Sequence, residues 1–204
     1  MIDTAATHKL SYGLFVLTTR EGEKDSGCII NTALQLTSTP LRLSITVNKQ
    51  NYTHDMILCS KKFNVSVIDE SADFELFKRF GFQSGRTADK FAGMEIPRTE
   101  NGLPYVQEHC NAVFACRVIE TVDCGTHTLF IADVTEAKVL SNTPSATYAY
   151  YFANIKPQPA KPAAQEKKTG WVCKICGYVY EGEELPADFI CPLCKHGAED
   201  FEKL

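Results

Sequence analysis

Alternating apolar and polar residues predict several short strands in the first half of the chain. Between residues 41 and 47, LRLSITV, every second residue is apolar and the residues between them are polar. The same alternation runs through 63–67, and the stretch 13–20, GLFVLTTR, is rich in apolar and β-branched residues. Successive side chains of a strand point to opposite faces, so these patterns predict strands. The polar stretch 21–25 contains a glycine and predicts a turn into a second strand through 27–30.

Three stretches show helical spacing instead. We expect a short helix over Thr4–Leu10 and a second helix, with a polar start, over Tyr52–Lys61. A third helix is expected over Asp73–Phe80, where phenylalanine recurs every three residues.

Two long strands are expected after an irregular middle that contains several glycines and prolines. They run over Asn111–Val122 and Thr126–Leu140, and residues 123–126 can close them into a hairpin. We expect one last short strand over Tyr148–Phe152. Many antiparallel strands with few helices indicate a mainly β protein with a closed antiparallel barrel, not a parallel sheet.

The composition changes after the barrel. Residues 156–170, KPQPAKPAAQEKKTG, hold three prolines and no aliphatic residue larger than alanine. Such a stretch is typical of a linker. We therefore predict a domain over 1–154, a Pro/Ala/Lys-rich flexible linker over 155–170 and a small domain over 171–204.

The small domain contains two C-x-x-C pairs, Cys173 with Cys176 and Cys191 with Cys194. Two residues between cysteines let a tight turn aim both sulfurs at one point, and two such turns can complete a tetrahedral S4 site for zinc or iron. Gly177 follows the first pair, where a positive φ costs glycine little. Four cysteines could instead form disulfides in a secreted protein. The spacing favours a metal, and a zinc ribbon and an iron site both stay open at this point.

Overall composition is that of a soluble globular protein, with 44% hydrophobic and 23% charged residues. There is no apolar run of membrane-spanning length, and the first residues do not resemble a signal peptide. We therefore expect a cytoplasmic protein without membrane contact, whose other cysteines stay reduced and pack in the fold. These are Cys28, Cys59, Cys110, Cys116 and Cys124.

Charge differs between the two predicted domains. Residues 171–204 carry three Lys and Arg against seven Asp and Glu, whereas residues 1–154 carry 14 against 17. An acidic surface repels nucleic acid and attracts a basic patch on a protein partner. The charge therefore argues against nucleic-acid binding.

A one-electron metal site needs an electron source, and a fused domain with a two-electron cofactor could supply one. The sequence contains neither G-x-G-x-x-G after a strand nor a P-loop motif, which argues against those nucleotide sites. It does contain a run of small polar residues over Asn31–Ser38, whose amides and hydroxyls could bond the edge of a planar heterocycle. The same run could be an ordinary loop and strand.

The C-terminal segments WVCKICGYVYEG and FICPLCKHGAEDFEKL resemble rubredoxin, in particular the short-looped rubredoxin domain of rubrerythrins. The resemblance implies one iron that carries one electron, and it favours iron over zinc. Two features depart from the family pattern. Only 14 residues separate Cys176 from Cys191, and Lys195 stands where glycine is usual.

Four segments of residues 1–153 resemble the flavin reductase-like family, the FMN-binding split barrels: GCIINTALQLTSTP, VNKQNYTHDMI, SGRTADKFAG and GTHTLFIADV. The resemblance implies an antiparallel split β-barrel, FMN held by a homodimer, and NADH or NADPH as the reductant. One group of matching residues is then expected to border the flavin ring, namely Asn31, Thr32, Ala33, Gln35, Leu36 and Thr37. A second group is expected to bind the ribityl phosphate, namely Asn48, Lys49, Asn51, Tyr52, Thr53 and His54. A basic, donor-rich loop before a helix N-terminus suits a phosphate as well.

Four further residues have both a functional and a structural interpretation. His127 lies beside the hairpin turn and could line the flavin or nicotinamide site as a catalytic group, or could be a surface residue. Arg86 and Lys90 could contact a phosphate or the nicotinamide dinucleotide, or be solvated charges. Cys28 lies next to the expected flavin edge, and a role for it stays open.

The two resemblances together are those of the high-molecular-weight rubredoxins. They imply hydride transfer from NAD(P)H to FMN, then single electrons to the iron and on to an acceptor, typically a flavodiiron protein that reduces oxygen or nitric oxide. Two alternatives stay open: a reductase of free flavin or ferric chelates, and a non-enzymatic electron shuttle with a structural zinc ribbon.

Overall fold

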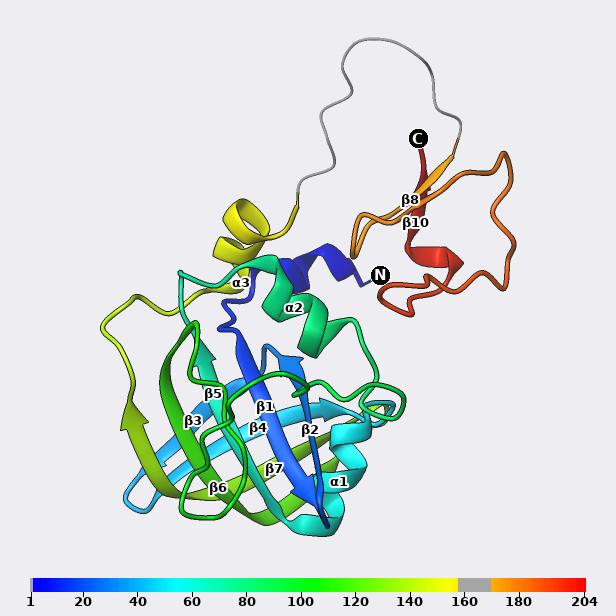
Figure 1. Ribbon diagram of the computed structural model, residues 1–204. Coiled ribbons are helices and arrows are strands. Elements are labelled where there is room, and N and C mark those ends of the chain that lie inside the picture. Colours follow the sequence, from blue (N-terminus) through cyan, green and yellow to red (C-terminus); the bar gives the residue numbers. More distant parts are fainter. Residues whose placement is uncertain (1, 158–169) are drawn as a thin grey trace. The chain divides into compact units, whose positions relative to one another are not determined.

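The computed structural model describes residues 2–157 and 170–204 (Figure 1). The chain divides into two compact units, Met1–Lys156 and Pro157–Leu204, and each is described by itself. The predicted linker at 155–170 lies outside the described residues over 158–169.

The first unit is built on one antiparallel sheet of seven strands in the order β2-β1-β5-β6-β7-β4-β3. Figure 1 shows the strands curled around a common interior, so the predicted mainly β, antiparallel barrel fold is confirmed. The strands are β1 (Phe15–Glu21), β2 (Lys24–Ile30), β3 (Ala33–Ser38), β4 (Leu41–Asn48), β5 (Lys62–Ile68), β6 (Cys110–Asp123) and β7 (His127–Val139).

Alternation places one face of each strand in the barrel core. Ile45 and Val47 of β4 are fully buried, as are Phe63 of β5 and Phe130 of β7. Polar residues between them, such as Thr46, point to the outer face because neighbours in a strand face opposite ways.

Short helices cover parts of the barrel. They are η1 (Thr4–Lys9), α1 (Tyr52–Ser60) and α2 (Phe74–Gly81). Asp73 caps α2, since its carboxylate accepts hydrogen bonds from the backbone N–H groups of Glu75 (3.0 Å) and Leu76 (3.2 Å). All three expected helices are confirmed within two residues at each end.

The strand expected over Tyr148–Phe152 is wrong. Residues there form α3 (Tyr148–Tyr150) and a π-helical turn, η2 (Tyr151–Ile155). Thr147 caps this segment by accepting a hydrogen bond from the N–H of Tyr150 (3.1 Å), and the Tyr151 ring packs on Phe77 of α2 at 4.4 Å between centroids. A short aromatic run is compatible with either periodicity, and here the cap and the packing favour the helix.

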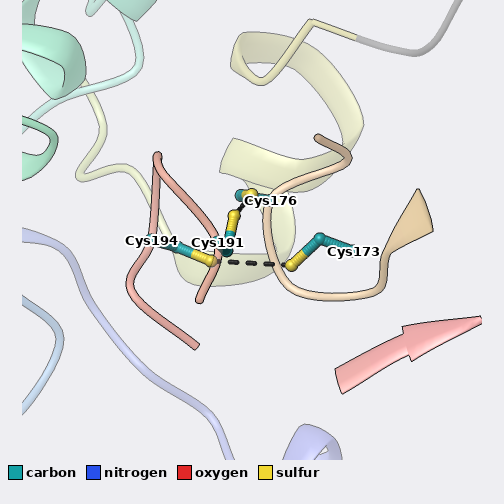
Figure 2. Close-up of side chains that lie close together, drawn as sticks. All are labelled: Cys173, Cys176, Cys191 and Cys194. Carbon is teal, nitrogen blue, oxygen red and sulfur yellow. Dashed lines mark hydrogen bonds between the residues drawn. The ribbon is translucent and has the colours of Figure 1, made fainter. Parts of the chain in front are cut away.

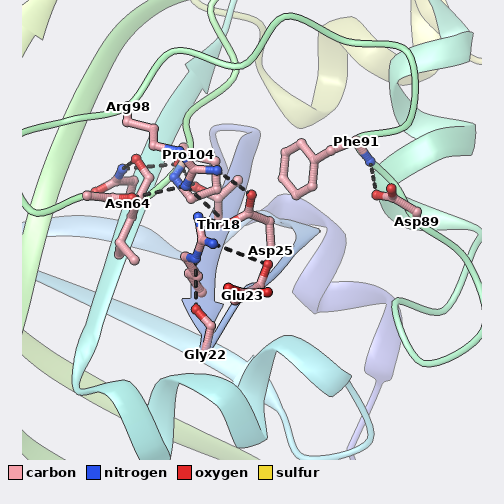
Figure 3. A network of polar contacts seen from close by, with 12 residues as sticks. Thr18, Gly22, Glu23, Asp25, Asn64, Asp89, Phe91, Arg98 and Pro104 are labelled. Carbon is pink, nitrogen blue, oxygen red and sulfur yellow. Dashed lines mark hydrogen bonds and ion pairs between the residues drawn. The ribbon is translucent and has the colours of Figure 1, made fainter.

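A buried polar network fastens the irregular segment 98–105 to the barrel (Figure 3). The Asn64 amide of β5 donates to Thr99 Oγ1 at 2.8 Å and to the carbonyls of Leu103 and Pro104, each at 3.1 Å. Thr18 of β1 donates to the same Pro104 carbonyl at 2.6 Å. The segment lacks regular structure but is held from inside the barrel.

The second unit is a three-stranded antiparallel sheet in the order β10-β8-β9. Its elements are β8 (Trp171–Cys173), β9 (Val179–Tyr180), η3 (Ala198–Asp200) and β10 (Phe201–Lys203). Its small core consists of Cys173, Cys191 and Phe201, with aromatic rings packed around them.

Candidate metal centre and cofactor pocket

Two tight turns of the second unit carry the four cysteines. In the first turn the N–H of Gly177 donates to the carbonyl of Cys173 at 2.8 Å, and Gly177 has φ +77°. In the second turn the N–H of Lys195 donates to the carbonyl of Cys191 at 2.9 Å. The two turns therefore repeat one backbone design around each C-x-x-C pair.

The turns bring all four sulfurs together (Figure 2). The four Sγ atoms lie within 4.8 Å of one another, and the two close pairs are Cys173 with Cys194 at 3.5 Å and Cys176 with Cys191 at 3.4 Å. A metal with sulfur ligands at about 2.3 Å needs sulfurs about 3.8 Å apart, so the cage has the size for a single ion. All nine cysteines of the chain are free thiols in the structure.

Two of the four thiols are costly to ionise without a cation. Burial raises the pKa of Cys176 to about 11 and also raises the pKa of Cys194. Burial acts in the same direction on Cys191, but the backbone N–H groups of Cys194 and Leu193 outweigh it and lower the pKa of this thiol. A metal ion holds such groups as thiolates, which makes the donor set suitable for zinc or iron.

Aromatic rings shield one side of the cage. Phe189 packs against Tyr180 at 4.8 Å and against Phe201 at 5.4 Å between centroids. Cys173 and Cys191 are buried, whereas the second cysteine of each pair is partly exposed. The site is thus dry on one side and open to solvent on the other.

A pocket of about 360 Å³ lies on the outer face of the first unit. It forms where β2 and β4 end, β7 begins and the chain enters α1. Five of the predicted site residues line it together, namely Asn31, Thr32, Asn48, Asn51 and His127. Sequence reasoning missed its other lining residues, Ile29, Ile30 and Thr46, because apolar and hydroxyl side chains in strands carry no distinct signal.

Local hydrogen bonds fix the polar lining of this pocket. Thr32 Oγ1 donates to the carbonyl of Thr46 at 2.9 Å, and Asn48 Oδ1 accepts from the N–H of Gln50 at 2.9 Å. Asn51 is the N-cap residue of α1, and its side chain makes no capping bond. The N-terminus of α1 is therefore available to an anionic group at the pocket.

His127 stands directly opposite Asn48 in the pairing of β7 with β4. Its Nδ1 lies 2.8 Å from Thr126 Oγ1. With Nδ1 engaged, Nε2 is the ring nitrogen that can meet a ligand in the pocket.

Strand β3 carries the rest of the group expected to border a flavin ring. It is an edge strand, and all of its residues after Ala33 are exposed. Ala33 and Gln35 line a separate apolar cavity of about 190 Å³. The structure therefore does not bring Ala33, Gln35, Leu36 and Thr37 into the pocket with Asn31 and Thr32.

The remaining residues expected at the phosphate are held by other protein groups. Lys49 Nζ lies 2.7 Å from the Asp123 carboxylate. The buried His54 places Nε2 at 2.9 Å from Thr128 Oγ1 and Nδ1 at 3.0 Å from Asp55. Thr53 is buried as well, with Oγ1 at 3.3 Å from Ser26 Oγ.

Tyr52 and Arg86 form a cluster beside the N-terminus of α1. The Arg86 guanidinium lies 4.9 Å from the centre of the Tyr52 ring and donates to the Asp55 carboxylate at 2.6 Å. The Lys24 ammonium lies 4.7 Å from the same ring. Hydrogen bonding from His54 is the first cause that lowers the pKa of Asp55, followed by Arg86, so this carboxylate stays ionised.

Lys90 lies inside the fold and not at the pocket. It is 5% exposed, and its ammonium donates to the carbonyls of Gly27 at 2.8 Å and Phe80 at 2.9 Å. Burial lowers the pKa of Lys90, and nearby Cys28 acts in the opposite direction. Burial also raises the pKa of Cys28 to about 11, so this thiol is a protonated core group.

Comparison with known proteins assigns both units. The family described as "Flavin reductase like domain" matches residues 7–158. The chain belongs to the flavin reductase-like family. The family described as "Rubrerythrin, rubredoxin-like domain" matches residues 171–202, and this assigns the four-cysteine unit.

Individual relatives agree with this assignment. The chain is 38% identical to "High molecular weight rubredoxin" of Moorella thermoacetica. The alignment is 229 positions long with its gaps and covers 100% of both chains. It is 38% identical to "Ferric-chelate reductase (NAD(P)H)" of Archaeoglobus fulgidus over 79% of this chain and 96% of the relative. The solved NADH:FAD oxidoreductase SgcE6 of Streptomyces globisporus shares the fold, with a TM-score of 0.65 and 19% identity over 72% of this chain and 91% of that one.

The chain is therefore an oxidoreductase that joins a flavin-binding domain to a four-cysteine iron site. Within the described residues, none of the helices has the length and apolar character needed to cross a membrane.

Proposed function

We propose that this chain is an NAD(P)H-dependent FMN oxidoreductase that passes single electrons to iron held by Cys173, Cys176, Cys191 and Cys194, and from there to an acceptor protein. The observation that carries the proposal is a thiol cage sized for one ion in a chain that also carries a flavin reductase-like domain. In domain terms, residues 1–154 hold the flavin, 155–170 act as a linker, and 171–204 deliver the electron.

The pocket lined by Asn31, Thr32, Asn48, Asn51 and His127 would hold the FMN. Amide and hydroxyl groups can bond the polar edge of a flavin ring, and the α1 N-terminus can hold its phosphate. Bound flavin supplies the conversion of two-electron transfer into one-electron transfer. His127, with Nδ1 held by Thr126, would orient Nε2 toward the nicotinamide or the flavin.

A second copy of the chain would cover this pocket. Leu34 of β3 is 66% exposed, and it pairs across the sheet with the buried Ser44, which pairs in turn with the partly exposed Ile131. The next row on the same outer face joins Thr46 and Leu129 to Val122, which is 42% exposed. Thr46 also lines the pocket, so an apolar surface of a second copy that packs against these residues would close the pocket. We therefore propose a homodimer through the flavin domain.

The acceptor would be a flavodiiron protein or a similar electron acceptor with a basic docking patch. The acidic balance of residues 171–204, three basic against seven acidic residues, supports this choice. We also propose a cytoplasmic setting, in which the five cysteines outside the metal site stay reduced.

One anaerobic titration tests the proposal. Purified protein is analysed for iron and FMN and then titrated with NADH or NADPH, with the flavin and ferric-thiolate absorption bands followed together. Both bands are expected to bleach. A protein that contains zinc instead of iron, or a flavin that NAD(P)H does not reduce, contradicts the proposal.

Truncation separates the relay from the main alternative. A chain ending at residue 156 should still reduce FMN with NAD(P)H and should lose transfer to the acceptor protein. Cys191→Ser in the full chain should behave in the same way, because one ligand of the iron is lost. If the truncated chain delivers electrons to the acceptor as well as the full chain does, the relay is wrong.

Ferric-chelate reduction is a second candidate function. The similarity to the Archaeoglobus ferric-chelate reductase, which covers 79% of this chain, favours it. Here the first unit alone would reduce the chelate. Two results together would support this function over the relay. The rate of ferric-chelate reduction would be the same with and without residues 157–204, and the full chain would reduce the acceptor protein slowly.

A further inference from the structure

The two cysteine turns differ at one backbone position. Gly177 and Lys195 each follow the second cysteine of a pair, and both adopt left-handed backbone conformations, with φ +77° and +62°. Both N–H groups make the same hydrogen bond, to the carbonyl of the first cysteine of their pair. Each of the two turns therefore requires a residue with positive φ. The first turn has glycine there, and the second has lysine.

Lysine at this position has a conformational cost. A left-handed backbone is sterically unfavourable for a residue with a Cβ, and glycine avoids this cost. The Lys195 side chain is exposed, so packing in the core does not offset this cost. Such outliers persist most often where they serve a functional site.

The position of Lys195 suggests what it contributes. It directly follows Cys194, which is one of the two partly exposed cysteines. The second unit is acidic, and Lys203, another of its lysines, lies over the Trp171 ring with its ammonium 5.9 Å from the centroid. Lys195 is therefore an exposed cationic residue directly next to a ligand of the thiol cage in the chain.

We propose that Lys195 raises the reduction potential of the metal centre by stabilising its reduced form. This inference rests on the proposed function, in which the four cysteines hold iron. Reduction from iron(III) to iron(II) adds one electron and no proton, so the four-thiolate centre becomes more negative by one charge. A cation beside Cys194 stabilises that state more than the oxidised one, and salt weakens the effect.

Substitutions in the full-length iron protein separate charge from backbone. Lys195→Gln removes the charge and keeps a side chain, and Lys195→Gly removes the charge and relieves the backbone. The potential is measured by spectroelectrochemistry on the ferric-thiolate band, and thermal unfolding is followed at the same band. Both variants should shift the potential to more negative values, with a larger shift at low ionic strength. Lys195→Gly should also raise the unfolding temperature of the centre.

Lys203→Gln is the matched control, because it changes the net charge of the unit by the same amount. Its potential should move less than that of Lys195→Gln. Equal shifts in the two variants, or no shift in Lys195→Gln, overturn the role of Lys195. Iron content is measured first in the unaltered protein: a protein without iron overturns the proposed function and this inference together, whereas iron with an unmoved potential overturns the inference alone.

Discussion

Lys90 is a buried cation held by two backbone carbonyls. Because its buried ammonium donates to two carbonyls, Lys90→Met should lower the free energy of unfolding by about 3 kcal/mol. Urea unfolding measures this loss. Lys78→Met, on the exposed face of α2 and paired with Glu75, is the control and should cost less than about 0.5 kcal/mol.

A cofactor role for Lys90 makes the opposite prediction. If this residue held a flavin phosphate, Lys90→Met would weaken FMN binding tenfold or more while leaving the stability of the flavin-free protein unchanged. That result would contradict the structural role assigned here. Sequence position could not decide between the roles, because the two acceptor carbonyls come from separate elements, Gly27 in β2 and Phe80 in α2.

Buried thiols give the barrel a sensitivity to alkaline pH. Burial raises the pKa of Cys116 to about 12 and of Cys28 to about 11, from 9.0. Above pH 9 the unfolded chain therefore loses protons that the folded chain keeps, and stability falls as pH rises, by up to about 1.4 kcal/mol per pH unit for each thiol. Urea midpoints should decrease between pH 9 and 11.

Removing one buried thiol tests this cause. Cys116→Ala should lower stability at pH 7 by about 1–2 kcal/mol, because it leaves a small cavity, and should flatten the decline above pH 9. Cys124→Ala, which removes an exposed thiol at the β6–β7 turn, should keep the original decline. If Cys116→Ala leaves the slope unaltered, other groups cause the alkaline sensitivity.

Among the elements, the alternation of apolar and polar residues predicted a strand correctly where one face of the strand lies in the core. The alternation in 41–47 corresponds to β4, whose inward residues fill the barrel. The strand predicted over Tyr148–Phe152 was wrong because five aromatic and small residues fit both the strand period and the helix period. The helix is favoured by the Thr147 cap and by the packing of Tyr151 on Phe77. Tertiary context of this kind is absent from a local pattern.

The segment 98–105 shows how an element without periodicity is held. Asn64→Ala would leave the carbonyls of Leu103 and Pro104 without their amide donor inside the barrel, and it should cost about 3 kcal/mol. Hydrogen exchange of residues 98–105 should also become faster, because the Asn64 bonds are lost, although the Thr18 bond to Pro104 remains. Asn154→Ala, at an exposed helical position, is the control and should change neither quantity. Unchanged exchange in Asn64→Ala would contradict this attachment.

At the level of the whole molecule, the two sites differ in how far sequence could define them. The metal cage is local: two turns of four residues set its geometry, so spacing alone brought the four sulfurs together. The pocket draws on β2, β4, β7 and the start of α1, so its membership depends on strand register. The family resemblance therefore named five of its residues but could not separate them from those of β3, which do not line it.

The proposed dimer supplies the last prediction, because an open pocket on an outer sheet face needs a cover. Leu34→Lys places a charge at an exposed apolar position two residues after Thr32 of the pocket, so it should shift the protein from dimer to monomer and release FMN. Analytical ultracentrifugation and the FMN content after gel filtration measure the two effects. Val139→Lys is the control, since Val139 is 79% exposed at the far end of β7 from His127, and it should leave both unchanged. A Leu34→Lys protein that stays dimeric and keeps its FMN would show that this face is not the dimer interface.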